Sequence, residues 1–244
     1  MMPEHDEIYG KYVENYEELV SKEDYQHNLL PALLKIADFK GKDIIELGGG
    51  TGRISLQIAP LAHSINIFDL SPYMLSLAEE KLKKKSLKNW TVAAADSRFI
   101  PVKNNMAHTV ISGWSISYIV QWNFNIWEKE LNRVFDEINR ILQPGGTILI
   151  IETLGTGYKT PFLRDEKLKL YYSYLEKELL FDRTSIRTDY EFSNIDEADR
   201  ILRFFFGDNL TDYIIKEKNY MEENNHIIIP ECTGIWWKRL NRTE

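Results

Sequence analysis

Short apolar runs and longer amphipathic stretches alternate along the middle of the chain. The short runs are typical of buried strands, and the stretches between them have the spacing of helices with ten or more residues. The strand patterns fall at residues 43–47, 64–68, 90–95, 109–112 and 147–153, and the helical patterns at 52–62, 73–86 and 124–142. Such alternation implies crossover connections and a parallel sheet with helices on both faces. We therefore predict a doubly wound α/β fold.

The flanking segments are less regular. The patterns predict one or two helices over residues 9–34, helices at 162–181 and 195–206, and strands at 187–192 and 226–238. Pro230 lies inside the last of these and predicts a bulge or a sheet edge there. We expect residues 1–244 to form a single domain, made of an N-terminal helical cover (1–40), a core (41–153) and substrate-side helices and strands (154–244). Both flanks are expected to cover the carboxyl end of the sheet, where such folds bind ligands.

A glycine-rich turn follows the first strand pattern, with the sequence Glu46-Leu47-Gly48-Gly49-Gly50-Thr51-Gly52. Glycines there permit positive φ angles and let a ligand lie against bare backbone, and the following helix presents free N–H groups. Nicotinamide and flavin dinucleotides bind at a similar turn with the spacing G-x-G-x-x-G. Counted from Gly48, the third glycine of that spacing falls on Arg53. The observed pattern is instead E-x-G-x-G-x-G.

Acidic residues stand at or just beyond the ends of the first three strand patterns. They are Glu46, Asp69 and Asp96, and Asp69 lies 21 residues after Gly48, the distance at which an acid meets ribose hydroxyls. Asp96 is placed to accept a hydrogen bond from an adenine amino group. With Arg53 as the one base expected nearby, this crevice suits a pyrophosphate poorly and suits a ligand with an ammonium and a sulfonium group better.

Composition narrows the setting in which the protein acts. The net charge of −7 argues against general affinity for nucleic acid or acidic membranes. A local basic cluster is interpreted as the solvated end of a helix. It consists of Lys81, Lys83, Lys84, Lys85 and Lys88. The single cysteine, the polar N-terminus and the lack of any apolar run near ~18 residues predict a cytoplasmic protein that does not enter membranes.

Taken in order, these motifs resemble those of class I S-adenosylmethionine-dependent methyltransferases. The glycine turn resembles the first motif of that family, and the segment from Ile67 to Leu75 resembles the second. The segments that resemble the third motif and the turn before the fifth strand are Ala95-Asp96-Ser97 and Leu142-Gln143-Pro144-Gly145-Gly146. Residues 9–16 are similar to the tyrosine-bearing N-terminal helix of many small-molecule members. The resemblance implies a Rossmann-like seven-stranded sheet, mostly parallel, with an antiparallel last strand.

The resemblance also assigns roles toward S-adenosylmethionine, whose product is S-adenosylhomocysteine. It implies Gly48, Gly50 and Gly52 beside the methionine moiety, Asp69 at the ribose, and Asp96, Ser97 and Met74 around adenine. Glu46, Gly49 and Leu70 are expected to bind the cofactor as well. The resemblance further implies that Tyr12 and Tyr16 fold over the cofactor. The family often has an acid at the start of its fourth strand, where this chain has His108. That end of the strand is far from the cofactor, so we interpret His108 as a surface residue.

The sequence gives few signals for the residues that would contact the methyl acceptor. Trp114 and Ser115 follow the fourth strand directly and are expected to touch the cofactor. Tyr118 and His226 are the candidates for a catalytic base or hydrogen-bond donor at the acceptor, although packing roles explain both residues as well. No cluster has metal-ligand spacing, so we expect no metal.

The sequence therefore favours a methyltransferase that acts on an O, N or C atom of a small-molecule acceptor. The residues after the fourth strand, Ser112 to Ser115, lack the Asn-Pro-Pro-Tyr type of motif, and no basic and aromatic groove is evident, so we expect no nucleic-acid partner. Protein acceptors remain open, as do two other functions: a non-catalytic domain that binds S-adenosylmethionine or S-adenosylhomocysteine, and a NAD-dependent oxidoreductase. Nothing in the sequence sets the oligomeric state.

Overall fold

The computed structural model describes residues 9–241, which group into two compact units. Unit 1 contains the described residues up to Ala32 together with Thr153–Phe162 and Ser185–Thr233. Unit 2 contains Leu33–Glu152, Leu163–Thr184 and the chain from Gly234 onward. The predicted core therefore lies almost wholly in unit 2, and most of both predicted flanks lies in unit 1. The prediction of one domain over 1–244 stays a prediction.

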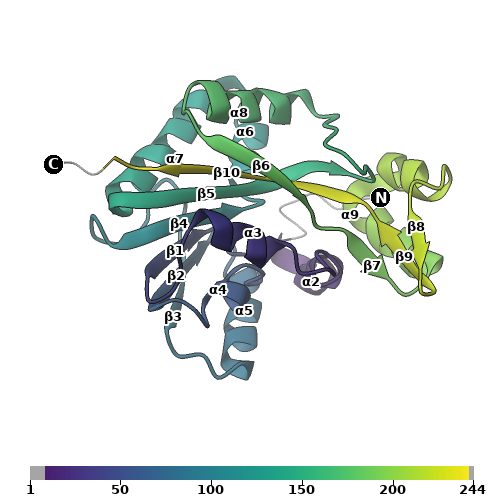
Figure 1. Ribbon diagram of the computed structural model, residues 1–244, viewed down its shortest axis with the longest axis horizontal. Helices are drawn as coiled ribbons and strands as arrows, with labels where there is room; N and C mark the ends of the chain where they lie inside the picture. The colour runs from purple at the N-terminus through teal and green to yellow at the C-terminus, as the bar shows by residue number, and fades with distance from the viewer. Residues whose placement is uncertain (1–8, 242–244) are drawn as a thin grey trace. The chain divides into compact units, whose positions relative to one another are not determined.

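A seven-stranded sheet has the order β3-β2-β1-β4-β5-β10-β6 (Figure 1). The strands are β1 (Asp43–Leu47), β2 (Ser64–Asp69), β3 (Trp90–Ala94), β4 (Ala107–Gly113), β5 (Leu142–Thr156), β6 (Asp182–Arg187) and β10 (Glu231–Arg239). The strands β3, β2, β1, β4 and β5 pair in parallel. Strand β10 runs against β5, which confirms the antiparallel last strand. The first five strand predictions are confirmed, and the sheet is mostly parallel as expected.

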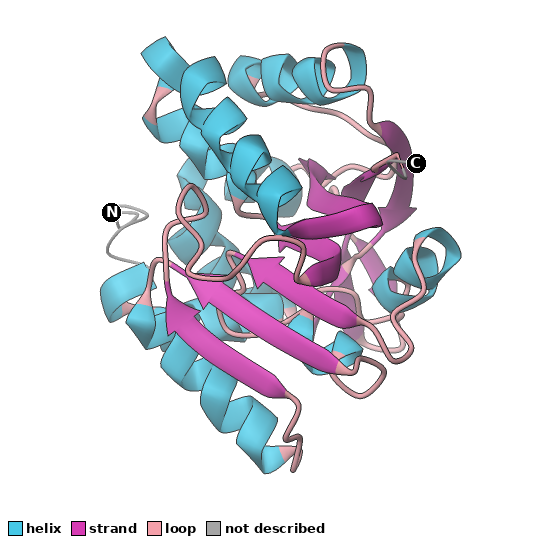
Figure 2. Ribbon diagram, turned by 90° about the vertical axis from the view of Figure 1, so that its left-hand side faces the viewer, coloured by secondary structure: helices cyan, strands magenta, loops and turns pink. Residues whose placement is uncertain are grey.

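Helices flank the strands of this sheet (Figure 2). Those of unit 2 are α4 (Ser55–Ile58), α5 (Pro72–Lys84), α6 (Ile116–Trp122), α7 (Trp127–Ile141) and α8 (Glu166–Lys177), with a short 3-10 helix η1 (Phe124–Ile126) before α7. Helix α5 begins as the sequence predicts, because the Ser71 hydroxyl accepts a hydrogen bond from Met74 N at 3.2 Å and Pro72 occupies the first turn. Helix α4 is much shorter than the predicted 52–62, since Gly52 at φ +81° delays its start.

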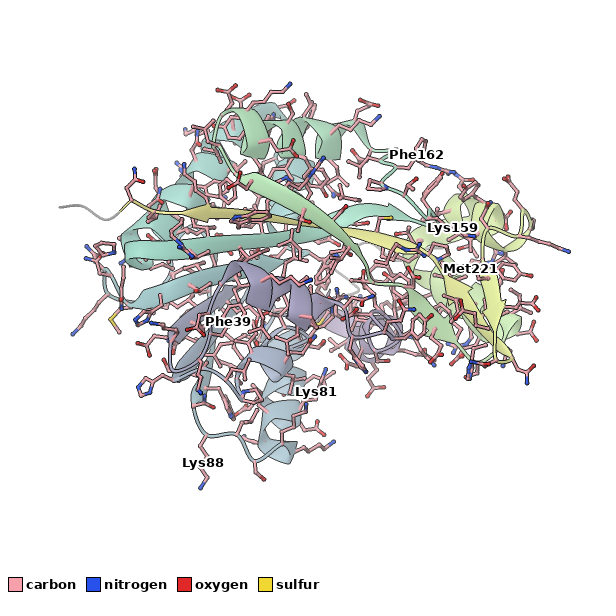
Figure 3. All side chains as sticks on the ribbon, viewed as in Figure 1. Phe39, Lys81, Lys88, Lys159, Phe162 and Met221 are labelled. Atoms are coloured by element: carbon pink, nitrogen blue, oxygen red, sulfur yellow. The ribbon has the colours of Figure 1, made fainter. Side chains whose placement is uncertain are left out.

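Basic residues gather in the last turn of α5, as the sequence analysis expects. Lys83 and Lys84 pair with Glu79 and Glu80 one turn earlier, at 2.7 and 2.6 Å. Figure 3 shows Lys88 pointing away from the protein beyond this helix end. These i,i+4 pairs on a solvated helix face support the interpretation of the cluster as a helix end.

Two proline-containing segments differ from their predictions. Strand β5 starts at Leu142 rather than at 147, because residues Gln143 to Gly146 form a bulge that shifts the register against β4 between Ala107 and Thr109. The predicted strand 226–238 is divided at Pro230, which has no N–H to continue a ladder. The first part is β9 (His226–Ile229), in a separate sheet, and the second is β10.

Unit 1 has its own small antiparallel sheet, in the order β7-β9-β8. Its elements are α2 (Val13–Val20), β7 (Tyr190–Phe192), α9 (Ile195–Ile215), β8 (Met221–Glu223) and β9, and helix α3 (Leu29–Ile36) begins in it. Its apolar core consists of Leu19, Tyr190, Phe192, Ala198, Ile201, Leu202, Ile214, Ile227 and Ile229. Helix α9 continues past its predicted end at 206 and bends at Gly207, whose φ of 74° is not helical. None of the helices in the described part of the chain is long and apolar enough to cross a membrane.

Trp236 is the largest side chain that is fully buried in the core of unit 2. Its indole Nε1 donates to Glu176 Oε1 at 3.0 Å, and its ring lies 4.4 Å from that of Tyr172. We expect Trp236→Ala to lower the free energy of unfolding by about 3–5 kcal/mol, because a large cavity remains and Glu176 loses one of its two partners, the other being Arg183 at 3.0 Å. Denaturant unfolding measures this change. The matched control is Trp237→Ala, whose side chain on the opposite face is only half-buried; an equal loss there would contradict the assignment.

Candidate functional site

The glycine turn connects β1 to α4 in a conformation that side chains rarely adopt. Gly48, Gly50 and Gly52 have φ angles of 68°, 52° and 81°. A Cβ atom on Gly48 would lie 1.8 Å from Ser115 Oγ, and one on Gly49 would lie 2.3 Å from Ile67 Cγ2 of β2. The turn is therefore packed between the end of β2 and the segment after β4. Glycine is required here both for φ and for close approach.

Glu46, the acid that leads the turn, faces the interior. Its side chain is 1% exposed, and its carboxylate accepts a hydrogen bond from the Ser55 hydroxyl at the start of α4. Burial raises the pKa of Glu46 to about 8, and the hydrogen bonds from Ser55 offset only part of that effect. In the structure this residue ties β1 to α4. Its predicted contact with the cofactor stays a prediction.

Asp69, at the end of β2, joins the turn to the neighbouring strand. Its Oδ2 accepts a hydrogen bond from Gly50 N at 2.8 Å, and its Oδ1 accepts one from Ser71 N at 2.8 Å. Burial raises the pKa of Asp69, and the backbone hydrogen bonds counteract it. The Leu70 backbone is a third donor, so of the roughly four acceptor sites of the carboxylate about one is left for a hydroxyl donor. The position beside the glycine turn matches the predicted ribose contact.

Asp96, beyond the end of β3, has a partner that the sequence analysis did not weigh. Arg98 donates to it from Nε at 2.9 Å and from a terminal nitrogen at 2.5 Å, and also pairs with the buried Glu130 of α7. The Arg98 guanidinium holds the pKa of Asp96 below its usual range. The expectation that Arg53 is the one base near these acids is therefore wrong. Glu130 also pairs with Arg133 at 2.9 Å, so the two carboxylates of this cluster are balanced by two guanidinium groups.

The connection from β4 to α6 packs against the glycine turn. Trp114 has a φ of 50°, and its backbone N donates to Ile151 O of β5 at 2.7 Å. The Arg53 guanidinium lies over the Trp114 ring at 3.3 Å, a cation–π contact that occupies this base. Ser115 seats against Gly48, as given above. Tyr118, in the first turn of α6, lies 5.3 Å from the ring of Trp122.

Apolar side chains around the predicted nucleoside position divide into exposed and buried ones. Leu70 and Phe99 are 60% and 69% exposed, and they follow the adjacent strands β2 and β3. Met74 is 1% exposed on α5, and Ser97 is half-buried beside Asp96. Exposed apolar surface at neighbouring strand ends suits the flat face of a nucleobase. Phe99 offers such a surface more directly than Met74 does.

Three predicted site residues lie in unit 1. Tyr12 and Tyr16 of the N-terminal segment pack against Phe204 and Phe205 of α9, with ring centroids 5.4 and 5.9 Å apart. His226 opens β9 and its Nδ1 lies 3.6 Å from Glu191 Oε1. It therefore belongs to the small sheet, whereas the sequence analysis placed it at the start of the predicted strand 226–238; that placement is wrong. The roles of all three toward ligands stay predictions.

The opposite end of the sheet contains His108. Its Nδ1 accepts a hydrogen bond from Asp43 N at 3.1 Å, at the first residue of β1. Parallel strands place that end away from the glycine turn, as the sequence analysis expects. Among residues 9–241 no three histidine, cysteine or acidic side chains gather as a metal site.

Comparison with known proteins supports the same site. Residues 44–146 match a family model described as Methyltransferase domain. The chain is 27% identical over 132 residues to an arsenite methyltransferase of Halobacterium salinarum, a match that covers 52% of this chain and 30% of that protein. It is 28% identical over 113 residues to the ubiquinone/menaquinone biosynthesis C-methyltransferase UbiE of Wigglesworthia glossinidia brevipalpis, covering 45% and 42%. The matches thus span less than half the length of these two relatives.

The fold is shared with solved structures. The crystal structure of the YcgJ protein from Bacillus subtilis superposes with a TM-score of 0.59 at 12% identity, and the match covers 89% of this chain and all of that one. Together, the strand order, the glycine turn and these matches support a methyltransferase domain of the S-adenosylmethionine-dependent class I fold over residues 44–146. S-adenosylmethionine is the cofactor of this class.

The residues around the glycine turn fit this cofactor. Asp69 offers carboxylate oxygens to hydroxyl donors, the glycine turn offers bare backbone, and Leu70 and Phe99 offer apolar faces to an adenine ring. The one guanidinium in the turn, that of Arg53, stacks on Trp114. This donor set suits a ribose and a cationic amino acid moiety better than a pyrophosphate. The roles of single residues in binding remain proposals.

Proposed function

We propose that this protein transfers the methyl group of S-adenosylmethionine to an O, N or C atom of a small-molecule acceptor by in-line displacement. The observation that carries the proposal is the hydrogen bond from Gly50 N to Asp69 at 2.8 Å. It joins the glycine turn after β1 to the end of β2, and these two strand ends would hold one ligand. One relative is named for methylation of arsenite, and the other is named for the biosynthesis of ubiquinone and menaquinone; all three are small molecules. An acidic chain with a net charge of −7 also suits such acceptors better than nucleic acid.

When bound, S-adenosylmethionine supplies a methyl group on a sulfonium, which is already a good electrophile. The protein therefore contributes mainly by orientation, which is worth up to ~7–11 kcal/mol of the barrier. Gly48 and Ser115 set the position of the turn that meets the methionine end, and Asp69 orients the ribose. Tyr118 remains the candidate to hold or accept a proton at the acceptor if the attacking atom carries one.

The test is methyl transfer from S-adenosylmethionine with a labelled methyl group to a panel of small acceptors that bear hydroxyl, amine, thiol, quinone-ring or arsenite groups. Formation of S-adenosylhomocysteine together with a labelled product supports the proposal and identifies the acceptor class. Asp69→Asn should lower the rate with the same acceptor. Tight cofactor binding without transfer to any acceptor would instead support the alternative of a non-catalytic binding domain.

A further inference from the structure

A buried carboxylate that the sequence analysis did not single out lies next to the site. Glu152 follows Ile151, whose carbonyl oxygen holds Trp114 N, and its side chain is 2% exposed. Its Oε1 accepts a hydrogen bond from Ser117 N at 3.0 Å, and its Oε2 accepts one from the Ser117 hydroxyl at 3.0 Å. The backbone of Ser115 donates to it as well. One carboxylate therefore binds both Ser115 and Ser117 at the start of α6.

Helix α6 lacks the usual cap from its own sequence. Ser115 is its N-cap residue, yet the Ser115 side chain makes no capping hydrogen bond to the helix. That side chain instead occupies the space against Gly48 that a Cβ atom would need. Glu152 accepts the hydrogen bond from Ser117 N that a serine side chain at the N-cap normally accepts, so the Ser115 side chain is not needed for this role.

The backbone beside Ser115 is held in an uncommon conformation. Trp114 has a φ of 50°, which a bulky residue adopts only when its surroundings enforce it. Ile151 O fixes its N–H from one side, and Glu152 fixes the next turn. Without the carboxylate, Ser115 is free to turn back toward α6 and to leave the glycine turn.

We propose that Glu152 is a positioning residue of the cofactor site: by capping α6 in place of Ser115, it holds Ser115 and Trp114 against the glycine turn. This inference rests on the S-adenosylmethionine site assigned above. Glu152 does not itself reach the ligand, and its effect passes through the connection between β4 and α6.

The protonation of Glu152 gives the proposal a measurable signature. Burial raises the pKa of Glu152 to about 7, and the hydrogen bonds from Ser117 and Ser115 offset part of that effect. Tyr171 of α8 is the titratable group whose own pKa responds to Glu152; burial raises that pKa well above its usual value, so Tyr171 stays neutral over this range. Glu46 titrates separately, with a pKa of about 8.

As Glu152 loses its proton, the stability of the fold and the affinity for the ligand change in opposite directions. A carboxyl whose pKa is higher in the folded state favours folding at low pH, and that contribution is lost as pH rises through about 7. Positioning needs the charged form, so affinity for the ligand should rise over the same range. If only the charged form binds, a pKa near 7 makes affinity about tenfold lower at pH 6 than at pH 8.

The experiment compares the wild-type protein with Glu152→Gln, using the Kd of S-adenosylhomocysteine from pH 6 to 8.5 and the Tm at each pH. Glutamine keeps the shape and one acceptor but no charge. We expect Glu152→Gln to bind about tenfold more weakly than wild type at pH 8, to lose the wild-type step near pH 7, and to have a Tm at pH 8 no lower than wild type. A purely structural role would leave Kd unchanged, or would raise Kd and lower Tm together.

Two further variants sharpen the result. Glu137→Gln is the matched control, because Glu137 accepts a hydrogen bond from Ile100 N at 2.6 Å and pairs with Arg140, away from α6. It should keep the wild-type pH profile of binding. In a Ser115→Ala background, Glu152→Gln should have a much smaller effect on Kd, since the two residues act through one contact.

The outcomes distinguish failure of the proposed role of Glu152 from failure of the cofactor assignment. If wild type binds S-adenosylhomocysteine and Glu152→Gln shows the same Kd and pH profile, the positioning role is overturned and the class assignment stands. If wild type does not bind S-adenosylhomocysteine at any pH, the cofactor assignment fails and this proposal fails with it.

Discussion

Gly48→Ala is expected to destabilise the protein by about 2–5 kcal/mol and to weaken binding of S-adenosylhomocysteine at least ~tenfold. A methyl group on Gly48 would lie 1.8 Å from Ser115 Oγ and 2.2 Å from Ser115 Cβ, so rotation of the hydroxyl alone cannot relieve the overlap. Either the glycine turn or the start of α6 must shift. Denaturant unfolding and calorimetric titration measure the two effects.

The chain offers a matched control for this substitution. Gly41 has a φ of 66°, close to the 68° of Gly48, but a Cβ atom there would meet nothing within 4 Å. Gly41→Ala therefore has the conformational cost alone and should leave ligand binding unchanged. Adding Ser115→Gly to Gly48→Ala should recover part of the stability, because it removes the overlapping atoms. Equal losses for Gly41→Ala and Gly48→Ala would show that close packing at the turn does not matter.

Asp69→Asn is expected to raise the Kd of S-adenosylhomocysteine by roughly 10–150-fold. This factor corresponds to the ~1.5–3 kcal/mol that a hydrogen bond to a charged acceptor contributes. The amide removes the charge and turns an NH₂ group toward Gly50 N or Ser71 N, which now each donate to a carboxylate oxygen at 2.8 Å. Burial raises the pKa of Asp69, so the neutral amide also removes a cost to folding. The Tm should therefore change little while binding is lost.

Asp38→Asn is the control for this effect. Asp38 accepts a hydrogen bond from Lys40 N at 2.9 Å in the loop before β1, at the end of the strand away from the glycine turn. Its replacement removes a carboxylate with a comparable backbone hydrogen bond and should not change the Kd. If Asp69→Asn retained wild-type affinity, the predicted ribose contact would be wrong.

Much of the central sheet follows from local patterns. The strands β1 to β4 are short apolar runs that end at glycine or acidic residues, and the Ser71-Pro72 pair marks the start of α5. The number of strands and the antiparallel direction of the last one came from the family resemblance, whereas the order of the strands is known only from the structure. The bulge at Gln143 to Gly146 and the division at Pro230 were less well predicted, because the sheet to which each segment pairs is decided by tertiary contacts.

The candidate site was predictable where its residues stand in sequence beside strand ends. The glycines and Asp69 are of this kind. Arg98 lies only two residues after Asp96, and that spacing was a signal for their ion pair that the sequence analysis did not use. Glu152 had no local signal, since it reads as one polar residue at the end of a β-branched run. Its role depends on Ser115 and Ser117, more than thirty residues earlier in the chain.

A thermal-unfolding scan with S-adenosylmethionine, S-adenosylhomocysteine, NAD and no ligand shows most directly which class of cofactor the protein binds. A ligand present at about 100 times its Kd adds ~2.7 kcal/mol to the native state, which corresponds to a rise in Tm of roughly 5–10 °C for a chain of this size. We expect this rise in Tm with S-adenosylmethionine and with S-adenosylhomocysteine, and no rise with NAD. A rise with NAD alone would contradict this expectation and would return the glycine turn to the dinucleotide-binding class.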